Sequence, residues 1–339
     1  MSTSRELVIK TLTFDNPERV PRELWALPWC YTNHPQKMKE IEEKYPADFG
    51  YIPSVYNPSS VEKGNMYEIG VAIDDWGCEF ESIFAGIIGE VKEPLLADLK
   101  DWDKVNPPYE TLPTNLTEAR DKVNKYCHES DKFIRMPNCA RPWERLQFLR
   151  TSVLAMYDIM DQEDELFKLL HKIHEFYLRE MEFWASTDVD ALFFMDDWGS
   201  QNQLLIPSTI WREIFKPMYR DYCDIARSSG KFIFMHSDGF IQEIYPDLIE
   251  IGVSAVNSQL FCMDFDYLSK IAKGKITFWG EIDRQHIMCA LDFEIGRQAV
   301  RKIKEKLGTG NGGLIAQFEL GPWSNLDMAF AIYDEWEKK

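Results

Sequence analysis

The chain has 339 residues, of which 45% are hydrophobic, 14% aromatic and 28% charged, and its formal net charge is −18. This composition is that of a folded globular protein, and the acidic balance excludes nucleic acid as a partner, because phosphates require clustered Lys and Arg. No apolar stretch is long enough for a membrane span, and seven scattered cysteines without a Cys-x-x-Cys pair indicate reduced thiols, so we expect a cytoplasmic protein.

Short apolar runs that end in polar residues alternate with helical patterns along the chain. The predicted strands are 24–29, 48–53, 133–138, 191–197, 231–237, 255–259, 276–282 and 313–319. The clearest predicted helices are 141–160, 163–186, 208–228, 240–251, 292–306 and 324–337. This alternation predicts an α/β fold with a parallel sheet, and eight strands match a closed (β/α)8 TIM barrel. An open doubly wound sheet would carry a glycine-rich phosphate turn after an early strand, and none is visible.

One segment departs from the alternation. Residues 67–93 have a different apolar pattern, which predicts an inserted hairpin. The loop-rich stretch 94–115 reads as an ordered connection, and no flexible linker divides the chain. We therefore expect a single domain over 1–339.

Polar residues stand at the ends of the later predicted strands. Asp196 and Asp197 end the fourth strand, and the following ends carry these further polar residues: His236, Asp238, Asn257, Gln259, Glu281, Gln317 and Glu319. In a barrel, catalytic residues come from the carboxyl ends of several strands. Each residue alone has a simpler interpretation: Asp196 or Asp197 could cap a following helix or pair with an Arg, and His236 could be a core histidine.

Together these ends offer one imidazole and several carboxylates. His236, Glu281, Glu319 and Asp238 form a candidate metal site, and zinc with an open coordination position would suit it. Without a metal, the same groups would act as acid, base and hydrogen-bond partners.

Several motifs resemble the uroporphyrinogen decarboxylase superfamily across nearly the whole chain. They are residues 16–21 (NPERVP), 75–77 (DWG), 194–201 (FMDDWGSQ), 205–207 (LIP), 211–217 (WREIFKP), 230–239 (GKFIFMHSDG) and 278–283 (FWGEID). The resemblance implies the TIM-barrel fold and one of two activities. One branch decarboxylates a porphyrinogen without a metal, and the other comprises zinc-dependent, corrinoid-linked methyltransferases.

The N-terminal region separates the two branches. The decarboxylases hold substrate carboxylates with an arginine-rich motif, whereas the matching residues 24–30 (LWALPWC) contain no arginine. Trp25, Trp29 and Tyr31 would make an aromatic wall there, or simply pack in the core.

The resemblance to the methyltransferase branch also has a departure. Its thiol-methylating members bind zinc through His-x-Cys and a later Cys, but here Asp238 stands at the first Cys position and residues 317–321 contain no Cys. The resemblance therefore implies oxygen and nitrogen ligands, as in methyltransferases that demethylate aryl ethers.

The resulting hypothesis is transfer of a methyl group from a small-molecule methyl donor, a methoxylated aromatic, to the Co(I) of cobalamin carried by a partner corrinoid protein. Zinc held by His236, Asp238, Glu281 and Glu319 would assist, with Asp197, Asp238 and His236 as catalytic groups. The candidate substrate-binding residues are Trp25, Trp76, Trp198, Gln201, Asn257, Gln259, Trp279 and Trp323.

Two alternatives remain at this stage. The chain could be a carboxy-lyase that acts on a smaller acid, or a non-catalytic barrel that binds a corrinoid protein. Members of the family often pair, which leaves a homodimer open.

Overall fold

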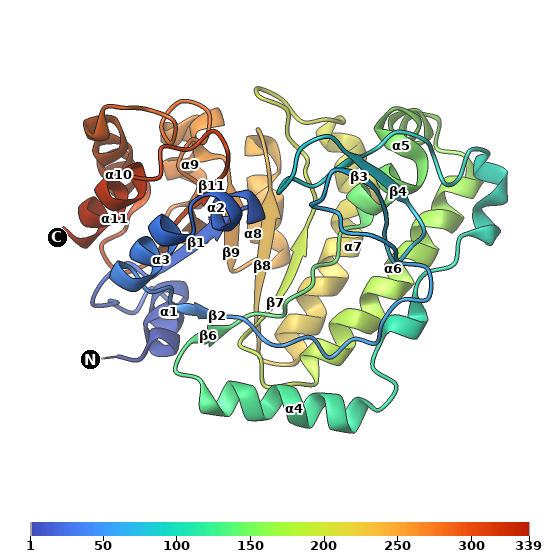
Figure 1. Cartoon of the computed structure of the whole chain (residues 1–339), viewed down its shortest axis with the longest axis horizontal. Helices are drawn as coiled ribbons and strands as arrows, with labels where there is room; N and C mark the ends of the chain where they lie inside the picture. Colours follow the sequence, from blue (N-terminus) through green and yellow to red (C-terminus); the bar gives the residue numbers. More distant parts are fainter. Residues whose placement is uncertain (1, 339) are drawn as a thin grey trace.

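The computed structural model describes residues 2–338 and contains a curled, six-stranded parallel sheet at its centre (Figure 1). Its strand order is β1-β11-β10-β9-β8-β7, and every neighbouring pair is parallel. The bounds are β1 Arg22–Ala26, β7 Ala191–Met195, β8 Phe232–Ser237, β9 Ala255–Ser258, β10 Thr277–Trp279 and β11 Leu314–Leu320. Apart from β1, which begins with Arg22 and Glu23 and is mostly half-buried, these strands are largely buried, as strands of a covered parallel sheet are.

Two further parallel strands complete the set of eight. β2 (Phe49–Gly50) pairs with β6 (Phe133–Ile134). The parallel bridge Arg135–Ala191 links this pair to β7, and Asp48 N–H donates to the Arg22 carbonyl at 2.9 Å next to β1. All eight predicted strands are therefore confirmed, but within residues 2–338 their ladder is not continuous, so the predicted closed barrel is seen in part.

The six predicted helices are observed as α5, α6, α7, α8, α10 and α11, with bounds that differ by up to five residues, and α1–α4 and α9 are additional. Their bounds are α1 Ser4–Leu12, α2 Pro28–Asn33, α3 Pro35–Lys44, α4 Leu116–Glu129, α5 Pro142–Asp161, α6 Asp164–Ala185, α7 Ser208–Ser228, α8 Tyr245–Ile251, α9 Phe265–Ala272, α10 Phe293–Leu307 and α11 Met328–Glu337. α10 shows why they form: Asp292 caps its first turn, and residues such as Val300 and Ile303 bury one face. In Figure 1, α5–α7 flank one side of the sheet and α9–α11 the other.

The insertion is a small antiparallel sheet of three strands, β3 (Gly70–Ile73), β4 (Glu79–Ser82) and β5 (Glu90–Val91). The predicted hairpin is thus extended by one short strand. Arg145 of α5 ties the insertion to the barrel, because its Nη1 donates to Asp74 Oδ2 in the turn between β3 and β4. The insertion therefore lies beside the first turns of α5.

Among the described residues, none of the helices has both the length and the apolar character that a bilayer span needs.

Candidate active site

His236, the penultimate residue of β8, lies at the carboxyl edge of the sheet with 6% of its surface exposed. Its Nδ1 lies 2.6 Å from Asn257 Oδ1. Asn257 Nδ2 donates to the Trp279 carbonyl at 2.6 Å and to Gln317 Oε1 at 2.9 Å, which fixes the amide orientation. Because Asn257 presents its oxygen, Nδ1 of His236 carries a hydrogen, and in the neutral imidazole the lone pair is then on Nε2.

That free nitrogen faces two carboxylates. Nε2 lies 3.5 Å from Asp197 Oδ1 and 3.7 Å from Asp238 Oδ1. Within the described part of the chain, Asp197, His236 and Asp238 form a group whose ligand atoms all lie within 4.8 Å of one another. Asp238 Oδ1 is buried and has no hydrogen-bond partner among these residues, which is costly unless a cation or a ligand completes the site.

The loops after β7 and β8 are joined through their backbones. Asp238 N–H donates to Asp197 Oδ1 at 2.8 Å, and Gly199 N–H donates to the Asp238 carbonyl at 3.1 Å. Gly239 has φ +74°, and a Cβ there would lie 2.1 Å from the Gly199 carbonyl oxygen. Only glycine permits this approach, so the sequence Asp238-Gly239 sets how the two carboxylates face each other.

Arg284 lies at the centre of a second group of carboxylates. Its Nη1 donates to Glu319 Oε1 at 2.8 Å, its Nη2 donates to Asp238 Oδ2, and its Nε lies 3.2 Å from Glu281 Oε1. Glu281 and Glu319 are thus paired with a guanidinium, and they do not belong to the group around His236 Nε2. Asp238 is the residue that joins the two groups.

Burial and like charge shift the pKa values of this region upward. Burial, then Asp238 and Glu319, raises the pKa of Glu281 well above its ordinary value, although Arg284 opposes the shift. Burial and Asp238 raise the pKa of Asp197. Burial, with Asp197 beside it, raises the pKa of Glu144 to about 7, against the lowering effect of Arg141. Such shifts are typical of functional sites, where charge is held at the expense of stability.

A cavity of about 600 Å³ adjoins the centre at Asp238. Its lining residues are Gly199, Ser200, Gln201, Asp238, Gly239, Gln259, Arg284, Gln285 and Trp323. Three of the predicted substrate-binding residues, Gln201, Gln259 and Trp323, therefore border the same space as Asp238. The volume and the few convergent polar groups fit a small organic ligand.

Comparison with known proteins assigns the family. The model of the family described as uroporphyrinogen decarboxylase (URO-D) matches residues 66–323. The chain belongs to the uroporphyrinogen decarboxylase family. Its fold is similar to that of a methyltransferase from Methanosarcina mazei, with a TM-score of 0.71 and 13% identity over 99% of each chain. No curated protein matches the chain by sequence.

Other solved structures share less of the fold. A dihydropteroate synthase from Xanthomonas albilineans has a TM-score of 0.31 and 14% identity, covering 48% of this chain and 56% of its own. An endo-1,4-beta-xylanase from Caldicellulosiruptor owensensis has a TM-score of 0.37 and 13% identity, covering 66% and 77%.

The other predicted aromatic residues of this URO-D chain lie in three different settings. Trp25 packs 5.2 Å from the His236 ring and edge-on to Trp279, which is fully buried. Trp198 is also fully buried, stacks on Trp143 and donates its Nε1–H to Tyr219, so core packing accounts for it. Trp76 lines a different cavity, beside the insertion.

Asp196 caps a helix, as the sequence allowed, but the helix is α5, which precedes it in the chain, and not the helix that follows. Its carboxylate accepts hydrogen bonds from the backbone N–H groups of Trp143 and Glu144, in the first turn of α5, and from Tyr219 Oη–H. A carboxylate at a helix N-terminus stabilises the unpaired N–H groups there. Asp196 therefore fixes α5, and with it Glu144, beside Asp197.

Sequence reasoning missed two residues of the URO-D site. Arg284 follows Glu281 by three positions just after a strand end, and that spacing of opposite charges was a usable signal. Glu144 carried no such sequence signal, because its neighbours Asp197 and His236 come from strands far along the chain.

Proposed function

We propose that this member of the uroporphyrinogen decarboxylase family is a methyltransferase that moves a methyl group from a methoxylated aromatic to the Co(I) corrinoid of a partner protein, assisted by a metal ion. One observation carries the proposal: His236 Nε2 and two carboxylates converge beside an open cavity, and Asp238 Oδ1 has no partner among the described residues. The fold-level likeness to a methyltransferase adds support.

The donor set fits a zinc ion. Tetrahedral ligands about 2.0–2.2 Å from zinc are separated by roughly 3.3–3.6 Å. The separation from His236 Nε2 to Asp197 Oδ1, 3.5 Å, lies within this range, and the separation to Asp238 Oδ1, 3.7 Å, lies just beyond it. We therefore propose Asp197, His236 and Asp238 as the metal ligands. Glu281 and Glu319 form ion pairs with Arg284 and are not proposed as ligands. When bound, zinc would act as a Lewis acid on the ether oxygen of the donor.

The other residues of the site orient His236 and the methyl donor. Asn257 keeps the His236 lone pair directed at the centre, as a partner of a ligating histidine commonly does. Gln201 and Gln259 would bind polar substituents of the donor, and Trp323 would contact its ring. In the reaction the methyl carbon leaves the ether oxygen, which keeps the bonding electron pair as a phenolate. If no metal binds, a proton on Asp197 would take the same role.

The alternative carboxy-lyase activity is less well supported. A desolvated substrate carboxylate needs a cation, and Arg284 is the one cation that lines this cavity within the described chain. That guanidinium is already engaged by Asp238, Glu281 and Glu319.

The experiment is to purify the protein, measure its metal content, and follow the visible spectrum of cob(I)alamin with methoxyarenes. We expect metal-dependent methylation, and we expect Asp238→Asn and His236→Gln to lose both metal and activity. Gln203→Ala, an exposed residue, is the matched control. Full activity after chelation would exclude the Lewis-acid step. Release of carbon dioxide from small acids without methylation would favour the carboxy-lyase, and ligand binding without turnover would favour a binding protein.

A further inference from the structure

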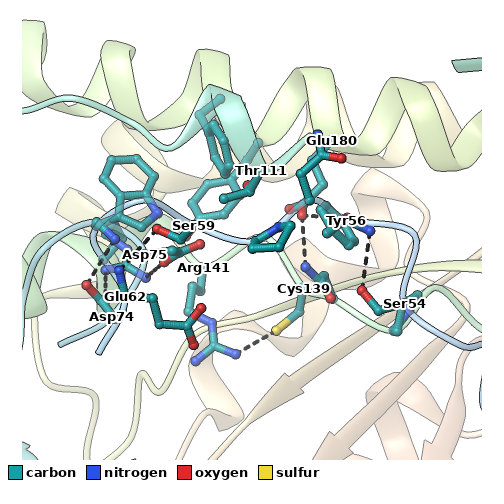
Figure 2. A pocket seen from close by; sticks show the side chains of 18 of the residues that line it. Ser54, Tyr56, Ser59, Glu62, Asp74, Asp75, Thr111, Cys139, Arg141 and Glu180 are labelled. Atoms are coloured by element: carbon teal, nitrogen blue, oxygen red, sulfur yellow. Dashed lines mark hydrogen bonds and ion pairs between the residues drawn. The ribbon is translucent and has the colours of Figure 1, made fainter. Parts of the chain in front are cut away.

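A second cavity, of about 590 Å³, lies between the insertion, the loop after β6 and helix α6 (Figure 2). It shares no lining residue with the cavity at Asp238. Its volume is in the range of small-molecule sites. The proposed reaction does not use this cavity, so its lining residues indicate a separate ligand.

Aromatic side chains form part of the wall. Trp76 packs edge-on against Phe176 with 5.2 Å between ring centroids, and lies 6.3 Å from Tyr177. Tyr56 is held in place because its Oη–H donates to Glu180 at 2.7 Å while accepting from Trp184 Nε1 at 2.6 Å. Such fixed π-faces attract cations.

The two arginines of the cavity are engaged elsewhere. Arg145 is 7% exposed, pairs with Asp74, and lies with its guanidinium carbon 4.8 Å from the centre of the Trp76 ring. Arg141 Nη2 donates to Cys139 Sγ at 2.9 Å, and its Nη1 lies 3.9 Å from Glu144. Arg145 also forms a long ion pair with Asp75, but neither arginine forms an ion pair with Glu180 within residues 2–338.

Glu180 is the buried acidic residue of the cavity that lacks such a partner among the described residues. Glu180 is 3% exposed, and its Oε1 accepts from Tyr56 and Asn138. Its Oε2 has no hydrogen bond and no ion pair among residues 2–338, although the residue lines the cavity. Asp75 has one ion pair, with Arg145 at 4.0 Å. Burial raises the pKa values of both Glu180 and Asp75, and a cation bound beside them would lower these pKa values again.

We propose that this cavity binds an organic ammonium ion, with the cationic group beside the Glu180 carboxylate and the organic part against the aromatic wall of the cavity. An anion would meet the Glu180 carboxyl group, which has no ion pair among residues 2–338, and a neutral ligand would leave that group without a counter-charge. The inference concerns binding alone and holds whether or not the protein transfers methyl groups.

The test is isothermal titration of the full chain with 2-phenylethylammonium and with its neutral isostere 2-phenylethanol, without any methyl donor. We expect the ammonium to bind at least tenfold more tightly than the alcohol. Glu180→Gln should weaken ammonium binding at least tenfold and leave alcohol binding unchanged. Glu129→Gln, at an exposed site on α4, is the matched control.

Three results would overturn the proposal: equal affinity for the two probes, tighter binding of the anion 3-phenylpropionate, or an unchanged ammonium affinity in the Glu180→Gln variant. If Glu180→Gln does not fold, Asp75→Asn, whose side chain is 38% exposed, makes the same comparison. Because no turnover is measured, failure of the proposed methyl transfer leaves this test unaffected.

Discussion

His236 donates its Nδ1–H to the side-chain oxygen of Asn257, 2.6 Å away, and the opposite nitrogen thereby faces Asp197 and Asp238. A single amide therefore decides which nitrogen of the imidazole can bind a cation or accept a proton. Sequence reasoning assigned Asn257 to substrate binding, but this amide is buried and all three of its hydrogen bonds go to protein.

The first prediction concerns the hydrogen bond by which Asn257 orients His236. Asn257→Ala should lower zinc affinity and methyl-transfer rate by about 10–100-fold, as loss of a partner behind a ligating histidine does. Metal titration and steady-state kinetics measure both effects. The Asp197 and Asp238 carboxylates remain in the variant, so an unchanged zinc affinity would show that the tautomer of His236 is not what Asn257 controls.

The second prediction concerns Arg284, which contacts three carboxylates with a side chain 19% exposed. Arg284→Gln should destabilise the fold at pH 7 by about 3 kcal/mol, because it leaves buried negative charges without a cation. The loss should shrink at pH 5, where those carboxylates take up protons in the variant. Urea unfolding at the two pH values measures this. Arg284→Lys keeps the charge and should recover part of the stability; an equal loss at both pH values would speak against the charge argument.

The third prediction uses the pKa of Glu144, raised from 4.5 to about 7 by burial and by Asp197. A carboxyl with a higher pKa in the folded state stabilises the fold below its unfolded pKa, and this contribution is lost as pH rises through the folded pKa. Between about pH 4.5 and 8 the wild type should lose roughly 3 kcal/mol relative to Glu144→Gln. Denaturant titrations across that range would measure the difference, and parallel stability curves for the two proteins would contradict it.

The fourth prediction compares two glycines with similar backbone conformations. Gly239 (φ +74°) approaches the Gly199 backbone, whereas a Cβ at Gly230 (φ +68°) would meet nothing within 4 Å. Gly239→Ala should destabilise the protein by about 2 kcal/mol or more beyond Gly230→Ala, because only the former adds a steric clash to the backbone strain. Thermal melts of both variants give the comparison, and equal losses would mean that the two loops separate easily.

The eight strands and the longer helices could be predicted from the sequence because each has its own local pattern of apolar residues. Apolar runs marked all eight strands, and the predicted helix 163–186 is observed as Asp164–Ala185. The third strand of the insertion was missed because β5 is only two residues long and its partner β4 defines it.

The site was less accessible to sequence reasoning because it depends on contacts across the fold. Arg284 reaches Glu319 over 35 positions and Asp238 over 46, and Asp196 binds the start of α5 more than 50 positions earlier. Residue type and strand position predicted that His236, Asp238, Glu281 and Glu319 would gather at one edge. They did not predict that an arginine would divide them into two groups.

The backbone link between the loops after β7 and β8 has a further consequence. Since Asp238 N–H holds the Asp197 carboxylate and Gly199 N–H holds the Asp238 carbonyl, a shift of either loop carries the other with it. The Asp197 and Asp238 side chains therefore keep a fixed relative position. Binding a ligand between them then costs little conformational entropy.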